Sequence, residues 1–438
     1  MDFFNQHVLP PTREHLELLR YLLMLASLIE LPFLGVVMGS ASVSLFLALR
    51  DKDEANRTYA LVAHDLMRMA MPSRVAVAVF GILPLPVIWI VYGQWFVRST
   101  VNTMHLVPAG ALIIIAGLVL LMRYRGTLRR DGQSSLMSIG VGGAGLACLL
   151  VGTYVLYGSV SRFFDPERWF LHYHAVRTLT AWSLIWRYLV FVAASLAMSG
   201  AAILFFFFRW PRDEARIEGA EARFVKNLGA GMAIAGSVFF PVFGFFYLVT
   251  LSVVAVSGTL YVLLGTAVAL FFVIFVYAYR TLLSHAPRFG ARVFVLCLVV
   301  FTLMIVGDQT ALVNATREHT AGLALEAEQR GAEIDAKREA ASGGAAVANP
   351  VQGEKVFKTV CSTCHRMSER LVGPALQAVL PKYAGNPDAL VAFVRKPSKM
   401  NADYPPMPVL GLSLGDIKSV AAYLLAQAAP GDSTETGP

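Results

Sequence analysis

Charged residues are scarce in this chain. Only 15% of its 438 residues are Asp, Glu, Lys or Arg, while 56% are hydrophobic, and the mean hydropathy is +0.59. This balance excludes an ordinary soluble globular protein. The net charge of +8 is small for a chain of this length. We interpret it as a result of the basic residues that orient a membrane protein in the bilayer. We therefore expect no nucleic-acid partner.

Cysteine is scarce as well, with four residues in the whole chain. Cys148 and Cys297 lie inside long apolar stretches, where we interpret them as small packing residues rather than ligands. Only Cys361 and Cys364 stand close together, and they form part of a recognisable motif that is discussed below.

Long apolar stretches account for most of the chain. Eight of them reach the length of about 20 residues that a helix needs to cross a bilayer. They cover residues 17–49, 75–97, 104–122, 136–158, 178–208, 228–252, 255–279 and 292–312. The fold class predicted is therefore all-α, a polytopic membrane helix bundle of about eight spans within residues 1–312. The first stretch has no basic segment before it and is too long for a signal core, so we expect no cleavable signal peptide.

Basic residues are concentrated in alternate connections between these spans. Residues 50–74, 123–130, 209–226 and 280–292 hold most of them, and the connections in between are much poorer. The positive-inside rule then places both chain termini on the outer side of the membrane. We expect a multi-pass protein of a bacterial inner membrane, with the C-terminal region in the periplasm.

The most specific motif is Cys361-Ser362-Thr363-Cys364-His365. Two thiols at this spacing can add to the two vinyl groups of a haem, and the following His can ligate the iron. A CxxC pair alone can also be a redox dithiol or half of a zinc site. The flanking residues favour haem. They are Gly353 and Phe357 before the motif, Gly373-Pro374 after it, the loop Tyr404-Pro405-Pro406-Met407-Pro408, and a final amphipathic stretch at 414–426.

From about residue 349 to 428 the chain resembles the class I cytochrome c family. The resemblance implies one covalent haem c, with Cys361 and Cys364 as its thioether anchors. It also implies that His365 is the proximal metal ligand and Met407 the distal one, a pair that raises the haem potential relative to two His ligands. Met400 and Met367 are the alternative distal ligands.

Four regions follow from these patterns. They are the transmembrane bundle at 1–312, a polar helix with a flexible linker at 313–348, the cytochrome c domain at 349–430, and a disordered tail at 431–438. Residues 317–341 are rich in Ala, Glu, Arg and Lys without Pro, which predicts the polar helix. Ser342-Gly343-Gly344 then ends it.

Glu30 and Arg187 are the two candidate catalytic residues of the membrane region, because buried charges in a bilayer are costly unless they are paired or used. One interpretation is an ion pair between them. The other is a role in proton transfer or in binding a quinone headgroup. Asp308 and Gln309, near the outer end of the eighth span, fit a solvated helix end.

Five of the nine His residues fall at the outer surface on this topology: His7, His15, His105, His172 and His174. Imidazole can ligate haem b or bind a quinol hydroxyl. We take His172 and His174 as the best candidates for haem b ligands, although two positions apart on a helix they could not both serve one iron.

The first 210 residues or so resemble, in layout, the quinol-oxidising subunit I of cytochrome bd-type oxidases. The resemblance lies in the outer N-terminus, the Pro32-Phe33-Leu34-Gly35 interruption and the His-bearing loop before the fifth span. It implies that His172 or His174 holds a haem at the fifth span, and it implies quinol chemistry. The chain departs from that family in having Ser27 where a haem-ligating His is expected, and in lacking its Gly-Arg-Gln-Pro-Trp motif.

The function predicted is that of a membrane-bound respiratory electron-transfer subunit, an oxidoreductase component. Membrane quinol would pass electrons to haem c and then to a periplasmic cytochrome or another subunit of a respiratory complex. Five lysines make the haem domain basic, which suits an acidic partner: Lys355, Lys358, Lys382, Lys396 and Lys399. The alternatives are a non-catalytic membrane scaffold that presents a cytochrome c domain within a larger complex, and a transporter or sensor with a redox input.

Overall fold

The structure is a computed structural model. It describes residues 8–50, 57–100, 103–128, 135–169, 175–208, 219–284, 289–341, 348–400 and 403–428. These residues are almost entirely helical and contain no strand, so the all-α prediction is confirmed. Contacts divide the chain into two compact units, Met1–Leu325 and Glu326–Pro438.

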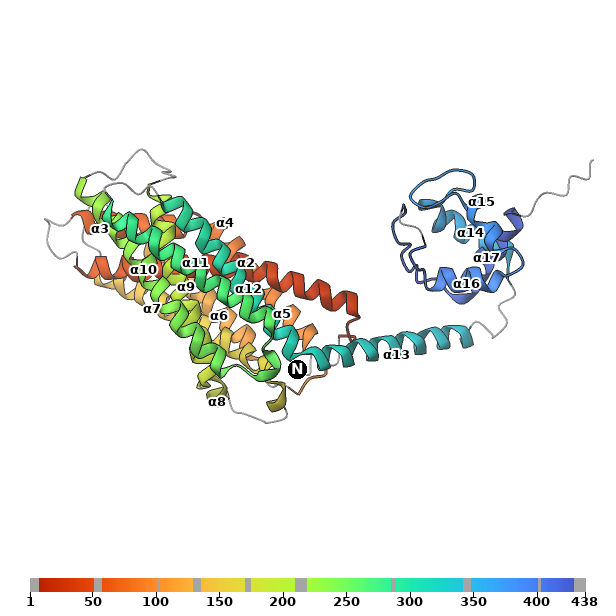
Figure 1. The fold of residues 1–438 in the computed structure, drawn as a ribbon, viewed down its shortest axis with the longest axis horizontal. Coiled ribbons are helices and arrows are strands. Elements are labelled where there is room, and N and C mark those ends of the chain that lie inside the picture. The colour runs from red at the N-terminus through yellow and green to blue at the C-terminus, as the bar shows by residue number, and fades with distance from the viewer. Residues whose placement is uncertain are drawn as a thin grey trace, which may run out of the picture. The chain divides into compact units, whose positions relative to one another are not determined.

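The first unit is a bundle in which eight helical segments are long and apolar enough to cross a membrane (Figure 1). They are α2 (Arg13–Arg50), the segment Arg74–Trp95, α6 (Leu106–Thr127), α7 with η2 (Leu136–Phe164), α9 (Trp182–Phe206), α10 (Gly219–Thr250), α11 (Gly258–Leu283) and α12 (Gly290–Ala315). The second of these consists of α4 (Arg74–Val77), the π-helical turn η1 (Ala78–Ile82) and α5 (Pro84–Trp95). The predicted membrane bundle is therefore confirmed.

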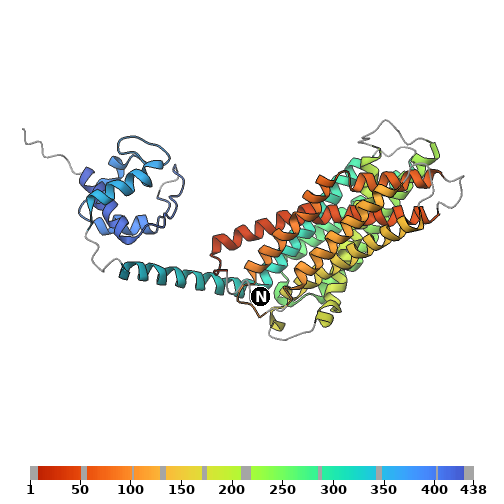
Figure 2. The ribbon, with the colours of Figure 1, turned by 180° about the vertical axis from the view of Figure 1, so that it is seen from behind.

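Shorter helices lie at the two ends of this bundle. The helix α3 (Arg57–Ala70) follows α2, and η2 (Arg162–Phe164), η3 (Pro166–Arg168) and α8 (Ala175–Leu179) connect α7 to α9. The turn η4 (Val253–Ala255) separates α10 from α11. Figure 2 shows the bundle from behind, with α3 at one end and the α7–α9 connection at the other.

Eight alternating spans bring the start of α2 and the end of α12 to the same end of the bundle. The helix α13 (Arg317–Ala341) begins there, directly after α12. We call this the exit end, because the chain leaves the bundle there. The ends of α7 and α10 and the start of α9 also lie at the exit end, and the functional residues described below are close to them.

Small residues let neighbouring spans approach closely. A Cβ atom on Gly152 of α7 would lie 2.8 Å from the backbone nitrogen of Ile114, and one on Gly117 of α6 would lie 2.9 Å from the carbonyl oxygen of Gly145. Neither position could therefore carry a side chain without moving the helices apart. Close packing of this kind stabilises helix pairs in lipid, where burial of apolar surface drives association little.

The second unit holds a small helical domain with its own apolar core. Its helices are α14 (Pro350–Thr359), η5 (Cys361–Thr363), α15 (Leu376–Val379), η6 (Leu380–Tyr383), α16 (Pro387–Arg395) and α17 (Leu414–Ala428). Asn349 caps α14 by accepting from the backbone nitrogen of Val351 at 3.0 Å. Where α14 crosses α17, a Cβ on Gly353 would lie 2.0 Å from the Ser419 carbonyl oxygen, so only Gly allows this crossing. The buried core consists of Val356, Leu376, Leu380, Leu390, Val391, Ile417, Val420, Ala421 and Leu424.

Candidate functional site

The two motif cysteines and the motif histidine line one cavity of the C-terminal domain. The turn η5 directs the chain so that the backbone nitrogens of Cys364 and His365 both donate to the Cys361 carbonyl oxygen, at 3.2 and 3.0 Å. The cavity has a volume of about 400 Å³, within the usual range for ligand pockets. A short local turn thus brings two thiols and an imidazole to the wall of one ligand-sized space.

The His365 ring is held in one orientation. Its Nδ1 lies 3.2 Å from the Pro374 carbonyl oxygen, so Nδ1 carries the proton and donates to that oxygen. This hydrogen bond leaves Nε2 with its lone pair available for a metal. Gly373 passes so close to the ring that a Cβ there would lie 2.3 Å from Cε1. The Gly373-Pro374 pair therefore both makes room for the imidazole and fixes its tautomer.

Two of the three methionines considered as distal ligands line the cavity. Met407, in the proline-rich loop, is half-buried, whereas Met400 is 59% exposed. Met367 packs against the apolar core of the domain instead and does not line the cavity. The geometry therefore leaves Met407 and Met400 as candidates, with Met407 the more enclosed.

The remaining walls suit a large apolar ring system. Apolar side chains from α15, η6, α16 and α17 form most of the lining, among them Leu380, Leu390, Val420 and Leu424. Burial raises the pKa of the Cys361 thiol, which keeps it uncharged at neutral pH. Two thiols, one imidazole nitrogen and a thioether sulfur around an apolar cavity are the donor set that haem c requires.

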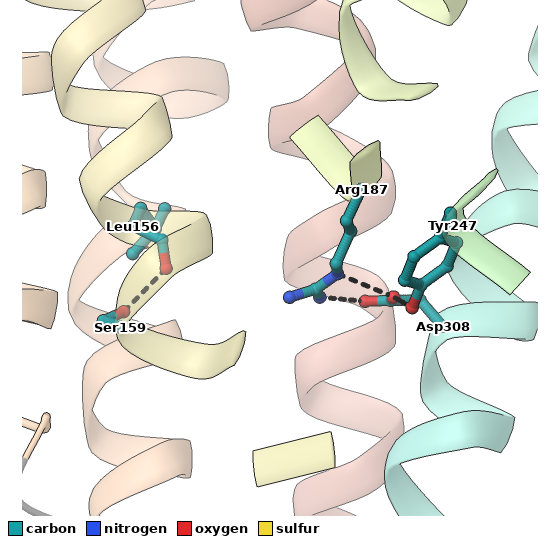
Figure 3. A network of polar contacts seen from close by, with 5 residues as sticks. All are labelled: Leu156, Ser159, Arg187, Tyr247 and Asp308. Carbon is teal, nitrogen blue, oxygen red and sulfur yellow. Dashed lines mark hydrogen bonds and ion pairs between the residues drawn. The ribbon is translucent and has the colours of Figure 1, made fainter. Parts of the chain in front are cut away.

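In the membrane bundle, Arg187 is paired with Asp308 and not with Glu30. Its Nε donates to Asp308 Oδ1 at 3.0 Å, and its Nη2 makes a short contact with Asp308 Oδ2 (Figure 3). The Tyr247 hydroxyl donates to Oδ1 at 3.4 Å. The prediction of a Glu30–Arg187 ion pair is wrong, as is the interpretation of Asp308 as a solvated helix end. The rotation of α12 turns Asp308 into the bundle, where it faces α9 and α10.

Aromatic rings complete the surroundings of the Arg187 guanidinium. Its central carbon lies 4.4 Å from the ring centre of Phe164 and 4.9 Å from that of Tyr157. A cation over ring faces is attracted to them, and more strongly where water is excluded. Arg187 is thus a buried cation held by one carboxylate and two rings.

Glu30 is fully buried, and neither of its carboxyl oxygens has a hydrogen-bond partner among the described residues. It lines a cavity of about 80 Å³ together with Arg187, Asp308 and Tyr247. We call this the inner cavity. Sequence reasoning thus found two residues of one polar region, but it did not predict that Asp308 is the partner of Arg187.

A second cavity, of about 300 Å³, lies at the exit end, and we call it the outer cavity. Arg187 and Tyr247 line both cavities. The other polar residues of the outer cavity are Ser161, Asp165, Glu167, Ser183, Thr250 and Ser252. Among the described residues that line either cavity there is no His and no Cys.

The predicted haem b ligands His172 and His174 lie outside the described residues. Of the other outer-surface histidines, His15 and His105 are exposed, and His7 lies outside the described residues. Sequence reasoning passed over His319 of α13, whose Nε2 donates a hydrogen bond to the Trp95 carbonyl oxygen at 3.1 Å and whose ring stacks on Phe96. Its only signal was an imidazole near the start of a polar helix.

Comparisons with known proteins match the C-terminal domain. The family model for cytochrome c matches residues 350–428. The chain is 35% identical over 77 residues to cytochrome c-551 of Azotobacter vinelandii and 32% identical over 77 residues to cytochrome c-551 of Pseudomonas denitrificans. Each alignment covers 94% of the relative and 17% of this chain. No solved structure matches the chain significantly.

The family match, the two relatives and the geometry of the motif concern the same 80 or so residues. The cofactor of such a domain is haem c, and its chemistry is electron transfer. Through its C-terminal domain, the chain belongs to the cytochrome c family.

Proposed function

We propose that this protein is a membrane-bound electron-transfer subunit that takes electrons from membrane quinol and delivers them through haem c to a partner. The observation that carries the proposal is the joining of a cytochrome c cavity to a bundle of eight candidate spans. A single helix is enough to tether a domain to a membrane, so eight spans favour a role within the bilayer.

In the C-terminal domain, Cys361 and Cys364 would form the two thioether bonds to haem c, and His365 and Met407 would ligate its iron. Bound haem c supplies reversible one-electron exchange, so it can accept the two electrons of a quinol one at a time. Gly373 and Pro374 hold the His365 ring so that Nε2 is the coordinating nitrogen. The apolar lining would keep water away from the iron, and this exclusion of water would set the reduction potential of the haem.

The exit end of the bundle faces the periplasm in this proposal. Arginines and lysines of the described helices cluster at the opposite end, at positions such as Arg50, Arg74, Arg125, Lys226 and Arg280, which the positive-inside rule assigns to the cytoplasm. Because the chain leaves the bundle at the exit end, the haem domain is then on the side where haem c is attached.

The outer cavity is the proposed quinol site. Its volume of about 300 Å³ exceeds the cavity of about 150 Å³ that holds benzene in a protein interior. Arg187 offers hydrogen-bond donors to a quinone oxygen. The Tyr247 hydroxyl oxygen can accept from a quinol hydroxyl while it donates to Asp308, and Glu167 offers a further acceptor for a quinol hydroxyl proton. Oxidation of one quinol releases two protons and two electrons, and carboxylates at the exit end can accept the protons.

An acidic partner is proposed for the haem domain. The side chains of Lys382 and Lys399 line the cavity, and both residues are exposed, as are Lys355, Lys358 and Lys396. Positive charge beside the haem cavity steers an acidic partner toward the position from which electrons leave. The partner is a periplasmic cytochrome or a subunit of the same respiratory complex.

Rapid mixing of the purified full-length protein with a short-chain quinol tests the proposal. Haem c should become reduced, and Tyr247→Phe should slow that reduction about fivefold, because it removes a hydrogen bond worth about 1 kcal/mol. Tyr261→Phe is the matched control, since Tyr261 is 58% exposed on α11 and lines neither cavity. Reduction by dithionite should be equal in all three proteins.

If quinol does not reduce haem c in the wild-type protein, the membrane unit is a scaffold that presents a cytochrome to another enzyme. A pyridine haemochrome spectrum of the same sample decides the cofactor content. A b-type band beside the c-type band would support haem b as an intermediate carrier, with His172 and His174 the first residues to replace.

A further inference from the structure

Three buried polar side chains around the inner cavity have atoms that lack a hydrogen-bond partner within the described part of the chain. They are both carboxyl oxygens of Glu30, the Nη1 nitrogen of Arg187 and the Oε1 oxygen of Gln309. All three residues line the cavity and are at most 6% exposed. Figure 3 shows the second terminal nitrogen of Arg187 directed away from Asp308. Buried polar atoms left unpaired cost free energy, so a group that can both donate and accept is expected between them.

The size of the inner cavity selects that group. At about 80 Å³ it is smaller than the cavity of about 150 Å³ that accommodates a benzene ring, which excludes a quinone headgroup there. A single water needs a cavity of about 10–15 Å³, measured by the same kind of probe, together with two to four polar partners. The inner cavity therefore has the size and the polar groups for a short chain of water molecules.

The two cavities meet at one polar network. Arg187 and Tyr247 line both of them, and Asp308 holds these two side chains together. The outer cavity reaches the helix ends at Ser161 and Ser252, at the exit end. On α2 the inner cavity is lined by Leu23, Ser27, Glu30 and Leu31, and by no residue beyond them. The two cavities thus lead inward from the exit end as far as Glu30.

We propose that the two cavities form a water-filled half-channel through which Glu30 exchanges a proton with the aqueous phase at the exit end. The Arg187–Asp308–Tyr247 network is the junction that protons must pass. The ligands of this site are water and the proton. The titratable groups that face Glu30 across the inner cavity come from five other helical segments: Tyr92, Tyr157, Arg187, Tyr247 and Asp308.

The chemistry of each group is consistent with this role. A carboxyl group can bind a proton or release it, and water carries the proton by exchanging hydrogen bonds along a chain. Arg187 stays protonated, and the Asp308 carboxylate paired with it balances its charge, so the junction presents no net positive charge to a proton carried by water. The half-channel does not depend on quinol oxidation, since it needs only the geometry of the bundle.

Infrared difference spectroscopy of the full-length protein in lipid nanodiscs tests the proposal without any quinol. In wild type, the C=O stretching band of a protonated carboxyl should shift in D₂O and change with the pH of the bulk solution. Glu30→Gln should remove this band. Absence of a band that depends on Glu30, or a band insensitive to both D₂O and pH, would overturn the proposal.

A second variant keeps Glu30 and fills the cavity. Ser27 lines the inner cavity one turn before Glu30, so the larger side chain in Ser27→Leu should exclude water from it. After transfer into D₂O, the C=O band of Glu30 should then shift at least tenfold more slowly than in wild type. Ser42→Leu is the matched control on the same helix, since Ser42 is exposed and lines neither cavity. Equal exchange rates in Ser27→Leu and wild type would show that water does not reach Glu30 along this route.

Discussion

At the scale of single residues, the buried charge of Arg187 has the largest energetic consequence. Its side chain is 7% exposed, and Asp308 is its carboxylate partner in the bundle. An ion pair taken out of water gains little net stability, but the loss of one partner leaves an unpaired charge in a medium of low dielectric constant. A variant that loses only one of the two charges should therefore be much less stable than a variant that loses both.

We expect Asp308→Ala to destabilise the bundle by about 3 kcal/mol, because Arg187 then remains buried without its counter-ion. The double variant Arg187→Met/Asp308→Leu should recover most of that loss, since neither charge remains to be desolvated. Thermal unfolding in detergent, followed by circular dichroism, measures both effects. A double variant that is less stable than Asp308→Ala would contradict this account.

Met407 and Met400 both line the haem cavity, so either could be the distal ligand of the iron. We expect Met407→Ala to abolish the thioether-to-iron charge-transfer band and to lower the midpoint potential, because the loss of an axial thioether favours the oxidised iron. Met400→Ala should change neither quantity. Optical spectroscopy combined with a redox titration measures both, and the reverse pattern would assign Met400 as the ligand.

At the scale of elements, α13 is attached to the bundle by its first turn. His319 bonds to the Trp95 carbonyl oxygen at 3.1 Å and lies 5.2 Å from the ring of Trp169, measured between ring centres. Burial lowers the pKa of His319, and the hydrogen bond to Trp95 opposes part of that change. The buried imidazole is therefore neutral at pH values where a His in water is already protonated.

Because the pKa of His319 is lowered, a fall in pH weakens the attachment of α13 to the bundle. Above the ordinary imidazole pKa of about 6.5, His319 is neutral in both the attached and the detached state, and the contact is at full strength. Below that value the detached state binds a proton more readily, so the attachment weakens by up to about tenfold per pH unit. The weakening stops once the pH falls below the lowered pKa of the buried ring.

We therefore expect hydrogen exchange in the first turns of α13 to accelerate as the pH falls from 8 toward 5, after correction for the intrinsic exchange rate. In His319→Gln, whose amide can still donate to Trp95, this extra acceleration should disappear. His105→Gln is the matched control, because His105 is exposed at the same end of the bundle. An unchanged pH profile in His319→Gln would show that another group controls the attachment.

The elements themselves follow from apolar runs, but their ends do not. The first span was predicted at 17–49 and α2 is Arg13–Arg50, whereas the sixth was predicted at 228–252 and α10 already begins at Gly219. Hydropathy marks the part of a helix that contacts lipid, and polar turns continue beyond it into the interface.

The haem site was predictable because Cys361, Cys364 and His365 are neighbours in sequence. Arg187 and Asp308 are 121 residues apart, and their pairing depends on how two helices are rotated.

At the scale of the whole molecule, the proposed orientation in the membrane rests on the distribution of Arg and Lys between the two ends of the bundle. Alkaline phosphatase is active only outside the cytoplasm, so fusions report which side a loop faces. We expect activity for fusions after Ser99 or Ser161, at the exit end, and none for a fusion after Gly126, at the opposite end. Activity only after Gly126 would invert the assigned orientation.

The apolar core of the cytochrome domain is made entirely of residues between Val356 and Leu424. The domain therefore packs independently. A different one-electron carrier could be joined after α13 without changes to the bundle, and this domain could be attached to another membrane anchor. Exchange of a gene segment of about 80 codons would thus replace the one-electron carrier and leave the coding sequence of the bundle unchanged.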